Sequence, residues 1–551
     1  MSKEELLFVP LGGAGEFGMN LNLYGFGPAG GHRWMMVDLG IAFGNDSMPG
    51  VDVIMPDPGF IEDRRERLDG LVLTHAHEDH IGAVPYLWRR LECPIFTTPF
   101  TATVLRRKLD EAGIKLNSSL TEVPLNGRFR IGPFDLELIA LNHSIPEPNA
   151  IAIRTPAGTV LHTGDWKFDP DPVIGSAADE GPLRRLGDEG VLAIVCDSTN
   201  VFTSDESRSE AELLGSLTTL IGDCAERVAV TCFASNVARL KPIAAAARAN
   251  GRDVAVTGRS LKRFVAVARE NGFLADTPAF VEEEEAGYLP KDKSLIICTG
   301  SQGEPKAALA RVAADKHPNV GLEEGDTVVF SSRVIPGNET AIGRVHDQFV
   351  RRGIEVITER DHFVHVSGHP SRQELIRMYQ LIHPQIAIPV HGEVRHLAAN
   401  ARLAEGCRVD NAFVAENGAV LRLGPGAAGI VDHVPTGRLA VDGNRLVAMG
   451  SEPTRRRQIL YNGAVMVTLV LSAAGKLVEE PRISAIGLAD GGEAGPGDLI
   501  ADAAREALAE MPAKARRNDD KVQETVRIAV RRAFRRNFGK KPVTTVHLVR
   551  L

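Results

Sequence analysis

The first third of the chain alternates short apolar runs with turns rich in glycine and proline. Apolar runs bounded by such turns predict β-strands, which we place at residues 6–12, 19–26, 34–40, 70–75, 134–142, 150–158, 158–165 and 192–198. A helical period of apolar positions predicts helices at residues 83–91 and 101–113. Several strands run into a loop that carries His or Asp. Functional side chains often lie at such strand ends, where a rigid scaffold holds them.

From about residue 207 the pattern changes to alternating helices and strands. Helices are predicted at 212–228 and 237–251, and strands at 228–235, 253–258, 294–301, 326–332 and 353–359. This βαβ order predicts a parallel sheet of its own. Near residue 370 the first pattern returns, with a helix at 372–382 and a strand at 385–390. A segment inserted into a split first domain explains that return most simply.

A last unit follows residue 452. Strands are predicted at 464–472 and 543–551, helices at 497–511 and 521–537, and a glycine- and alanine-rich loop at 489–497. We find no repeat of the solenoid type. The predicted domains are therefore 1–207, an insertion at 208–369, a return of the first domain with a linker at 370–452, and a C-terminal domain at 453–551.

Length and composition are those of a soluble globular protein with several cores. The chain has 551 residues, of which 44% are hydrophobic and 24% charged. Its 6 cysteines are scattered singly without a CxxC pair, which argues against a disulfide framework or a thiolate zinc site. No segment resembles a secretory signal or is long enough to span a bilayer. We therefore expect a cytoplasmic protein.

The charge leaves the binding partner undecided. A formal net charge of −8 does not indicate a nucleic-acid binder, yet bound divalent cations would add positive charge locally. Basic clusters occur at 455–457 and at 531–536, the latter followed by Lys540 and Lys541. Solvated helix faces explain these clusters equally well.

A glycine motif near the N-terminus invites a nucleotide-binding interpretation. Gly13, Gly15 and Gly18 fit the GxGxxG pattern directly after a strand. A dinucleotide site would need a helix to begin there, so that its N-terminus could meet the pyrophosphate. The residues that follow alternate like a strand instead. A tight loop near a metal site is the better interpretation.

The strongest chemical signal is the run THAHEDH at the end of a predicted strand. It places His75, His77, Asp79 and His80 on one loop. A single histidine is usually structural, but imidazoles and a carboxylate this close together are the ligands that zinc and similar divalent cations take. Burying such a cluster without a cation would be costly. The run therefore predicts a metal site.

This HxHxDH run is the signature of the metallo-β-lactamase superfamily, which the chain resembles also in the order of its later motifs. The resemblance implies an αββα sandwich and a centre of two divalent cations, zinc by preference with manganese or magnesium as alternatives. It assigns to the first metal His75, His77 and His143, to the second Asp79, His80 and His391, and to a bridge between them Asp165. Two such cations can deprotonate a shared water and stabilise the oxyanions of an in-line displacement.

A narrower resemblance is to the β-CASP nucleases and, within them, to the bacterial ribonuclease J family. The matching blocks include GGAGEFGMN, NHSIPEP, LHTGDWKFD, CDSTN, CFASNVARL, TGSQGEP, VIPGNE, HVSGHP and PVHGEVRH, in family order. The resemblance implies that the insertion is a β-CASP α/β domain and that the chain ends in a small α/β domain. It also implies that the substrate is RNA.

The same resemblance assigns further site residues. Asp197 in CDSTN becomes a proton donor to the leaving oxygen, although an isolated strand-end Asp is usually a turn or cap residue. His369 becomes its general acid/base partner. The loop that would hold an RNA phosphate comprises His365, Val366, Ser367, Gly368 and His369, and a second part of the 5′-phosphate pocket comprises Phe233, Ala234 and Ser235.

Two weaker sequence signals and the C-terminal domain suggest further features. Gly50, Asp52 and Asp442 resemble a hard-cation site for calcium, although an exposed turn is equally plausible. His396 could orient a metal ligand through a hydrogen bond. The C-terminal domain of the family implies self-association, as a homodimer or homotetramer, and membership of an RNA-degrading complex.

The leading hypothesis is a 5′→3′ exoribonuclease that prefers 5′-monophosphorylated single-stranded RNA and releases nucleoside monophosphates, with internal cleavage as a further activity. Its roles would be RNA decay and maturation of rRNA and mRNA 5′ ends. A β-CASP nuclease acting on DNA and a non-catalytic scaffold subunit are the alternatives. A small-molecule hydrolase is a third, but it would have little use for the insertion.

Overall fold

A computed structural model describes residues 4–44, 48–116, 119–205, 207–488 and 496–551. The chain forms two compact units, Met1–Ala42 with Met55–Thr436, and Phe43–Ile54 with Gly437–Leu551. The loop predicted at 489–497 lies outside the described residues, apart from its last two positions. None of the helices in the described parts of the chain has both the length and the apolar character that a bilayer crossing requires.

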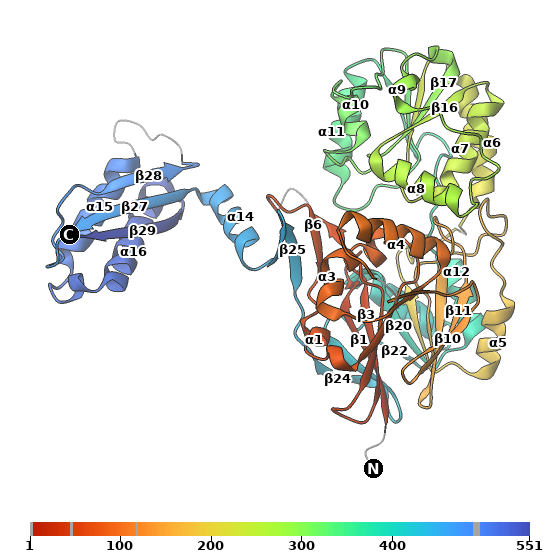
Figure 1. The fold of residues 1–551 in the computed structure, drawn as a ribbon, viewed down its shortest axis with the longest axis horizontal. Coiled ribbons are helices and arrows are strands. Elements are labelled where there is room, and N and C mark those ends of the chain that lie inside the picture. The colour runs from red at the N-terminus through yellow and green to blue at the C-terminus, as the bar shows by residue number, and fades with distance from the viewer. Residues whose placement is uncertain (1–3, 45–47, 117–118, 206, 489–495) are drawn as a thin grey trace. The chain divides into compact units, whose positions relative to one another are not determined.

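The first unit contains two large β-sheets (Figure 1). The 8-stranded sheet has the order β24 (Gly429–His433), β23 (Ala419–Gly424), β1 (Glu5–Gly12), β3 (Leu21–Gly27), β4 (Arg33–Val37), β7 (Leu68–Val72), β8 (Ile95–Thr97), β9 (Leu120–Glu122). The 7-stranded sheet has the order β10 (Arg128–Ile131), β11 (Phe134–Ala140), β12 (Asn149–Thr155), β13 (Gly158–His162), β14 (Ala193–Asp197), β20 (Ile386–Val390), β22 (Asn411–Ala412).

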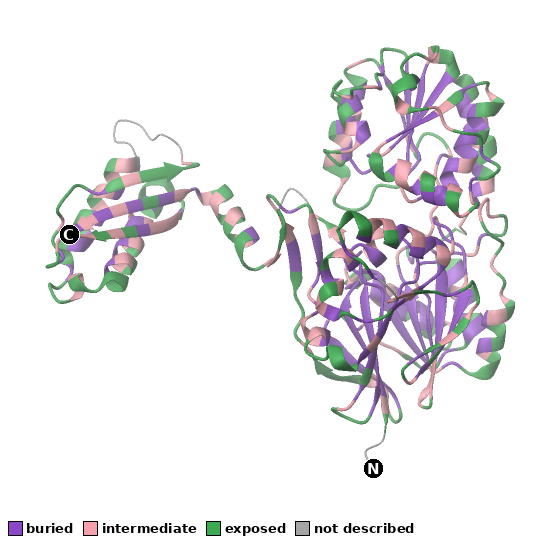
Figure 2. Ribbon diagram, in the orientation of Figure 1, coloured by how far each residue is buried: buried purple, intermediate pink, exposed green. Residues whose placement is uncertain are grey.

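These two sheets pack face to face over an apolar core. Phe8 and Tyr24 of the first sheet share this core with Ile151 and Val195 of the second, and the buried strands stand out in Figure 2. The other face of the second sheet packs against α5 (Gly181–Glu189), α12 (Arg372–Ile382) and α13 (Val394–Gly406). The helices beside the first sheet are α1 (Gly59–Glu62), the 3₁₀ turn η1 (Arg65–Arg67), α3 (Val84–Leu91) and α4 (Pro99–Glu111). The αββα prediction is confirmed.

The insertion has its own parallel sheet, as its βαβ pattern predicts. The 5 strands have the order β16 (Asp253–Thr257), β17 (Ser294–Cys298), β15 (Val228–Thr231), β18 (Thr327–Phe330), β19 (Glu355–Ile357). Its helices are α6 (Glu210–Asp223), α7 (Val237–Ala249), α8 (Arg259–Glu270), α9 (Glu283–Ala286), η2 (Lys291–Lys293), α10 (Ala308–Ala313) and α11 (Glu339–Val350).

One predicted helix is shorter than expected. Helix α6 ends at Asp223 rather than near residue 228, because the chain turns there into the buried strand β15. Arg227 holds that turn: its guanidinium donates to the hydroxyl of Ser294 and to the carbonyl of Gly321. These partners are distant in sequence, so local periodicity could not reveal where the helix stops.

The insertion leaves and re-enters the second sheet at neighbouring strands. β14 and β20 pair in parallel, with Asp197 opposite Val390. The carboxyl ends of these two strands therefore lie side by side, and the loops that follow them start from the same sheet edge. Residues separated by almost 200 positions are thereby brought to one place.

The second unit contains a 3-stranded sheet in the order β28 (Arg482–Ile486), β27 (Ala464–Leu471), β29 (Val543–Arg550). Buried residues of β27 alternate with more exposed ones and pack on α15 (Pro496–Glu510) and α16 (Asp519–Phe538). A further sheet has the order β26 (Arg445–Ala448), β25 (Arg438–Asp442), β6 (Val53–Pro56), β5 (Ala42–Phe43). The remaining elements are α14 (Glu452–Asn462) and η3 (Ala515–Arg517).

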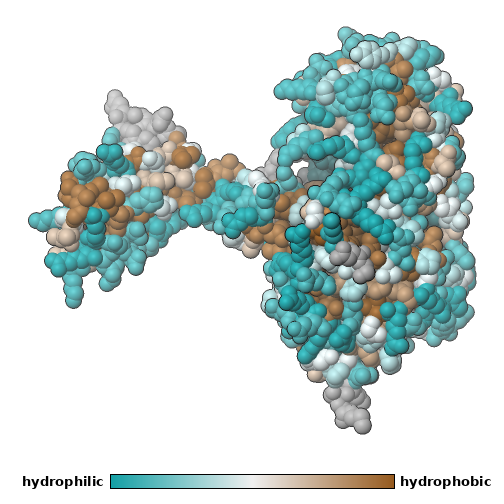
Figure 3. Space-filling view, in the orientation of Figure 1, coloured by the Kyte–Doolittle hydropathy of each residue, from teal (hydrophilic) through white to brown (hydrophobic). Residues whose placement is uncertain are grey.

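The surface of the second unit is mixed in character. The two basic clusters lie on α14 and α16. Apolar side chains also reach this surface (Figure 3), among them Met466 and Val549 on the sheet face turned away from the helices.

Candidate metal centre

The loop after β7 is held in place because its backbone accepts hydrogen bonds from two other segments of the chain. The amide of Leu39 donates to the carbonyl of His80 at 2.7 Å, and the amide of Asn20 donates to the carbonyl of Asp79 at 3.0 Å. Helix α2 (Glu78–Ile81) begins directly after His77. The histidines at either end of the loop, His75 and His80, are buried. The sequence run THAHEDH therefore becomes a fixed array of ligand atoms.

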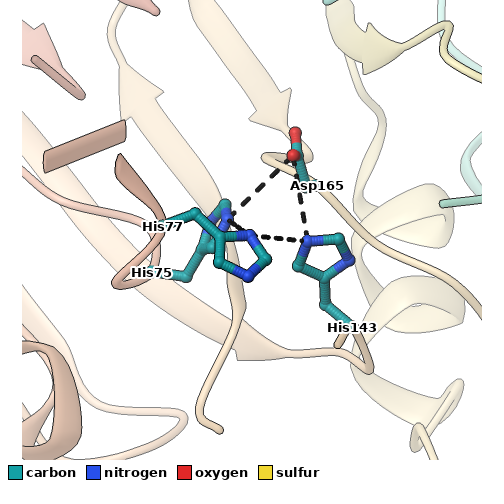
Figure 4. A group of neighbouring side chains, drawn as sticks. All are labelled: His75, His77, His143 and Asp165. Carbon is teal, nitrogen blue, oxygen red and sulfur yellow. Dashed lines mark hydrogen bonds and ion pairs between the residues drawn. The ribbon is translucent and has the colours of Figure 1, made fainter. Parts of the chain in front are cut away.

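One group of ligand atoms forms around His75, His77, His143 and Asp165 (Figure 4). Nδ1 of His77 lies 3.1 Å from Nε2 of His75 and 3.0 Å from Nε2 of His143. Oδ2 of Asp165 lies 4.0 Å from Nε2 of His75 and 3.9 Å from Nε2 of His143. Ring nitrogens that converge in this way fit a tetrahedral divalent cation.

A second group forms around Asp79, His80 and His391, again with Asp165. Oδ2 of Asp165 lies 3.2 Å from Nε2 of His80 and 3.5 Å from Nε2 of His391. Oδ2 of Asp79 lies 3.2 Å from Nε2 of His391. One carboxylate thus belongs to both groups, which is the geometry that a bridging ligand needs. The residues present fit a centre of two metal ions.

Hydrogen bonds fix which nitrogen of three histidines faces the centre. Nδ1 of His80 donates to Oδ2 of Asp38 at 2.7 Å, and Nδ1 of His143 donates to the carbonyl of Gly368 at 2.5 Å. Nδ1 of His391 donates to the hydroxyl of Thr199 at 2.9 Å. In each ring the lone pair of Nε2 is left free to bind a cation, and such partners would also strengthen the ligand.

Two of these partners, Asp38 and Thr199, were missed at the sequence level. Asp38 follows β4 directly and has a φ of 63°, which is unusual for a non-glycine residue. The signal that could have found it is an aspartate within an otherwise apolar predicted strand, whereas Asp165 was assigned through the family resemblance. Gly368 was assigned to phosphate binding, but its carbonyl also orients His143. A Cβ on Gly368 would lie 2.6 Å from Nδ1 of His143, so only glycine fits.

The pKa values divide the candidate ligands into two kinds. Burial lowers the pKa of His77 to about 4 and lowers the pKa of His75 and His143 well below the usual value, so these rings are neutral donors. Burial also acts on His391, but the Asp165 carboxylate outweighs it and raises its pKa to about 9. The pKa of Asp165 is well below its usual range: burial alone would raise it, but His391 and His80 outweigh burial. Its carboxylate is therefore ionised.

The glycine motif forms a loop beside this centre, and no helix of the kind that binds a dinucleotide begins after it. The residues after it form strand β3, as predicted. Gly13 and Gly15 have φ values of 85° and 93°, and the carbonyl of Gly13 accepts from the amide of His391 at 2.7 Å. The short strands β2 (Ala14–Gly15) and β21 (Gly392–Glu393) pair beside this contact. The loop thus positions His391, a candidate metal ligand.

Asp197 and His369 meet at the edge of the centre. Nδ1 of His369 donates to Oδ2 of Asp197 at 2.8 Å and lies 3.9 Å from Oδ2 of Asp165. Burial alone would lower the pKa of His369, but the Asp197 carboxylate outweighs it and the net pKa is raised. Asp197 is completely buried, and its other oxygen accepts from the amide and the hydroxyl of Thr199. The side chain of His369 is 22% exposed and therefore lies between Asp197 and the solvent.

The loop of residues 365–369 is held by a network of polar contacts. The amide nitrogen of Asn200 donates to the Ser367 hydroxyl at 2.8 Å and to the His369 carbonyl at 3.1 Å. The guanidinium of Arg239, which is fully buried, donates to the carbonyls of Val364 and Val366. Neither Asn200 nor Arg239 was singled out from the sequence, since each acts through partners more than 100 positions away.

The turn of Phe233, Ala234 and Ser235 lies between β15 and α7, and is half-buried. Arg239 belongs to the first turns of α7, and the same helix thus links this turn to the loop of residues 365–369. The structure brings the two proposed parts of the phosphate pocket to one helix.

The weaker assignments remain predictions. Asp442 pairs with Arg456 at 2.6 Å, and a Cβ on Gly50 would lie 3.1 Å from Nη1 of the same arginine. A calcium ion near Asp442 would therefore have to displace a guanidinium. His396 lies against the ring of Phe17, and its Nδ1 has no hydrogen-bond partner among the described residues.

Comparison with known proteins identifies the family. Profiles match for the metallo-β-lactamase superfamily at residues 27–193, the ribonuclease J β-CASP domain at 225–349, the Zn-dependent metallo-hydrolase RNA specificity domain at 353–414, and the ribonuclease J C-terminal domain at 454–551. Ribonuclease J of Sinorhizobium meliloti is 44% identical over 560 aligned residues, covering 100% of this chain and 98% of its own. The chain belongs to the ribonuclease J family.

Other ribonucleases J agree. That of Mycobacterium tuberculosis strain H37Rv is 39% identical over 96% of this chain and 93% of its own, and that of Thermus thermophilus 34% identical over 98% and 94%. A solved Enterococcus faecalis protein of unknown function shares the fold, with a TM-score of 0.52 and 15% identity over 76% of this chain and 100% of its own. As a ribonuclease J the chain is a metal-dependent β-CASP nuclease acting on RNA, as its motifs predict.

Proposed function

We propose that this ribonuclease degrades single-stranded RNA from the 5′ end, prefers a 5′-monophosphate, and releases nucleoside 5′-monophosphates. Internal cleavage is a further proposed activity of the same centre, on an RNA strand whose 5′ end has passed beyond the phosphate-binding loop. The roles that follow are RNA decay and the maturation of rRNA and mRNA 5′ ends in the cytoplasm.

One observation carries the proposal. The loop of residues 365–369 is bonded directly to the metal centre, since the Gly368 carbonyl accepts from Nδ1 of His143. A phosphate held by this loop, with Ser367 and backbone amides as donors, would lie at a constant distance from the ligands. Backbone amides in such turns favour anions. An enzyme that holds a terminal phosphate at a constant distance from its centre removes a constant number of nucleotides per step.

Zinc is the proposed metal, because the first group offers the three imidazoles of His75, His77 and His143, and imidazole nitrogens are ligands that zinc favours. When bound, the two cations supply an activated water and neutralise charge on the phosphate. Asp197, which the family resemblance makes the proton donor for the leaving oxygen, acts through its partner His369: it holds the imidazole in place and keeps it protonated, and the imidazole delivers the proton. Because Asp197 is buried behind His369, we propose that the two act as one acid rather than as separate donors.

The second unit is proposed to join copies of the chain into a homodimer or homotetramer, and to place the enzyme in an RNA-degrading complex. Met466 and Val549 are 42% and 45% exposed on the sheet face opposite α15 and α16. An apolar face of this kind favours contact with another protein surface.

The test is product analysis with the zinc-loaded enzyme. Two RNAs of one sequence, one with a 5′-monophosphate and one with a 5′-triphosphate, each carry a label in the first nucleotide. We expect labelled mononucleotide from the monophosphorylated RNA at the first time point and a slower reaction on the triphosphate. Equal rates on the two RNAs, or labelled oligonucleotides as first products, would contradict the proposal.

A further inference from the structure

A ladder of three aromatic rings, Phe17, His396 and Phe202, leads away from the metal centre. The ring of Phe17 lies 6.0 Å from that of His391 and 5.0 Å from that of His396, both edge-on. The ring of His396 lies 5.0 Å from that of Phe202, also edge-on. These spacings are those of favourable aromatic pairs. The ladder begins at a metal ligand and ends at Phe202, which is 59% exposed.

The outer ring is carried by an anchored turn. Phe202 follows Asn200, whose side chain is bonded to Ser367 and to the carbonyl of His369. The amide of Thr203 donates to the carbonyl of Asn200 at 2.8 Å and closes the turn. The backbone that presents Phe202 is therefore connected to the same loop that flanks the metal centre, and the ring has a defined position relative to that centre.

A single exposed phenylalanine is common on protein surfaces and needs no explanation. Phe202 differs because its ring is backed by His396, which is only 7% exposed, and because the backing continues to His391. Val394, 43% exposed, adds apolar surface beside the glycine loop: a Cβ on Gly15 would lie 3.6 Å from its Cγ2. The exposed ring of Phe202 is thus connected to His391 through a series of contacting rings.

We propose that Phe202, backed by His396 and Phe17, is a stacking platform for a nucleobase of the RNA strand. Every nucleobase offers a flat apolar face, so stacking on aromatic side chains holds single strands without regard to sequence. A ribonuclease that digests many RNAs needs contacts of this kind.

The ladder also indicates which nucleotide is bound. It leaves the centre at His391, in the second group of ligands, whereas the loop of residues 365–369 meets His143, in the first group. If that loop holds the 5′-phosphate, as the proposed function requires, the platform receives a base on the 3′ side of the cleaved bond. This placement rests on the proposed function, while the contact of Phe202 with RNA rests on the exposed ring and on membership of a family of ribonucleases.

The experiment combines substitutions of Phe202 with RNAs that lack one base. Zinc-loaded wild type, Phe202→Ala and Phe202→Tyr are assayed on 5′-monophosphorylated RNA and on matched RNAs with an abasic ribose at the first, second or third nucleotide. We expect Phe202→Ala to reduce kcat/KM on intact RNA about 10-fold, mainly through KM, because stacking on one side chain has about that value. Phe202→Tyr keeps the ring and should retain the wild-type rate.

The abasic RNAs test the partner of the ring. Wild type should lose about the same factor when the second or third base is missing, and on that RNA Phe202→Ala should cause no further loss. The control is Tyr288→Ala, which removes an aromatic side chain that is 89% exposed on the insertion; it should leave every rate unchanged. Melting temperatures of all variants confirm folding.

Three results would overturn the proposal: a wild-type rate for Phe202→Ala on intact RNA, the same fractional loss on every abasic RNA, or sensitivity confined to the first base. Rates are scored on whichever bond the wild type cleaves. If the wild type released no mononucleotide, the proposed 5′→3′ direction of degradation would be wrong. The effect of Phe202→Ala on cleavage of intact RNA would still decide whether the ring contacts the strand.

Discussion

Nδ1 of His369 donates to Oδ2 of Asp197 at 2.8 Å, and Asp197 is completely buried behind it. This pair joins the strand end of β14 to the loop at the end of the insertion, across 172 positions of the chain. A carboxylate in this place holds the imidazole in one orientation and stabilises its protonated form. The relationship makes a specific prediction about the acid that serves the leaving group.

Asp197→Asn should lower kcat on RNA by about 100-fold or more, since general acid catalysis contributes roughly 10²–10⁴-fold. The amide retains the shape of the carboxylate but loses the charge that raises the pKa of His369. KM should change little. Steady-state kinetics on labelled RNA measure both quantities, and His369→Ala in the same background should add little further loss. Independent, multiplicative losses would contradict the view that the pair acts as one acid.

Gly368→Ala should weaken the first metal site. The added Cβ would lie 2.6 Å from Nδ1 of His143 and displace the carbonyl that orients this ligand. Loss of such an orienting partner typically reduces metal affinity by about 10–100-fold. Competition of the apo-enzyme with a chromophoric zinc chelator measures the change.

The matched control for that substitution is Gly343→Ala in α11, where a Cβ would meet nothing within 4 Å. It should bind zinc as the wild type does. Wild-type zinc affinity in Gly368→Ala would show that the ring of His143 does not depend on the carbonyl.

Arg239→Met should destabilise the first unit strongly. The guanidinium is bonded to both carboxylate oxygens of Glu210 in a site where Arg239 is 0% and Glu210 4% exposed. Removing one partner of a buried pair leaves an uncompensated charge and costs about 3–5 kcal/mol. Urea unfolding followed by circular dichroism measures the loss. The double variant with Glu210→Met should recover part of it, and a double variant as unstable as the single one would argue against the charge as the cause.

Asp169→Asn should destabilise the protein by about 2 kcal/mol near neutral pH, where a charged hydrogen bond is lost. Oδ2 of Asp169 lies 2.8 Å from Nζ of Lys167, and both side chains are buried. Burial alone would raise the pKa of Asp169, but Lys167 outweighs it and lowers the pKa below its usual range. A carboxylate with a lowered folded pKa stabilises the protein above its unfolded pKa and loses that effect as the pH falls through the folded value.

The difference in unfolding free energy between wild type and Asp169→Asn should therefore be constant from neutral pH to about pH 5 and shrink below about pH 4. Urea titrations at a series of pH values measure it. A difference that stays the same down to pH 3 would show that the charge of Asp169 does not contribute.

The sequence by itself predicted most of the elements and the candidate metal ligands. Apolar periodicity is a local property, so strands such as β20 and helices such as α12 were predicted within a residue or two. The run from His75 to His80 carries its ligands on one loop, and its spacing alone indicates a metal. The assignment of Asp165 and His391 to the same centre came from a family resemblance, and the structure brings these residues together.

Only the tertiary structure decided how the ligands are oriented and what surrounds them. Asp38 meets His80, Thr199 meets His391 and Gly368 meets His143 because strands far apart in the chain end at one edge of the sandwich. Such contacts depend on the pairing of β14 with β20 across the insertion. No local pattern encodes them, because each is set by the packing of whole sheets rather than by the spacing of neighbouring residues.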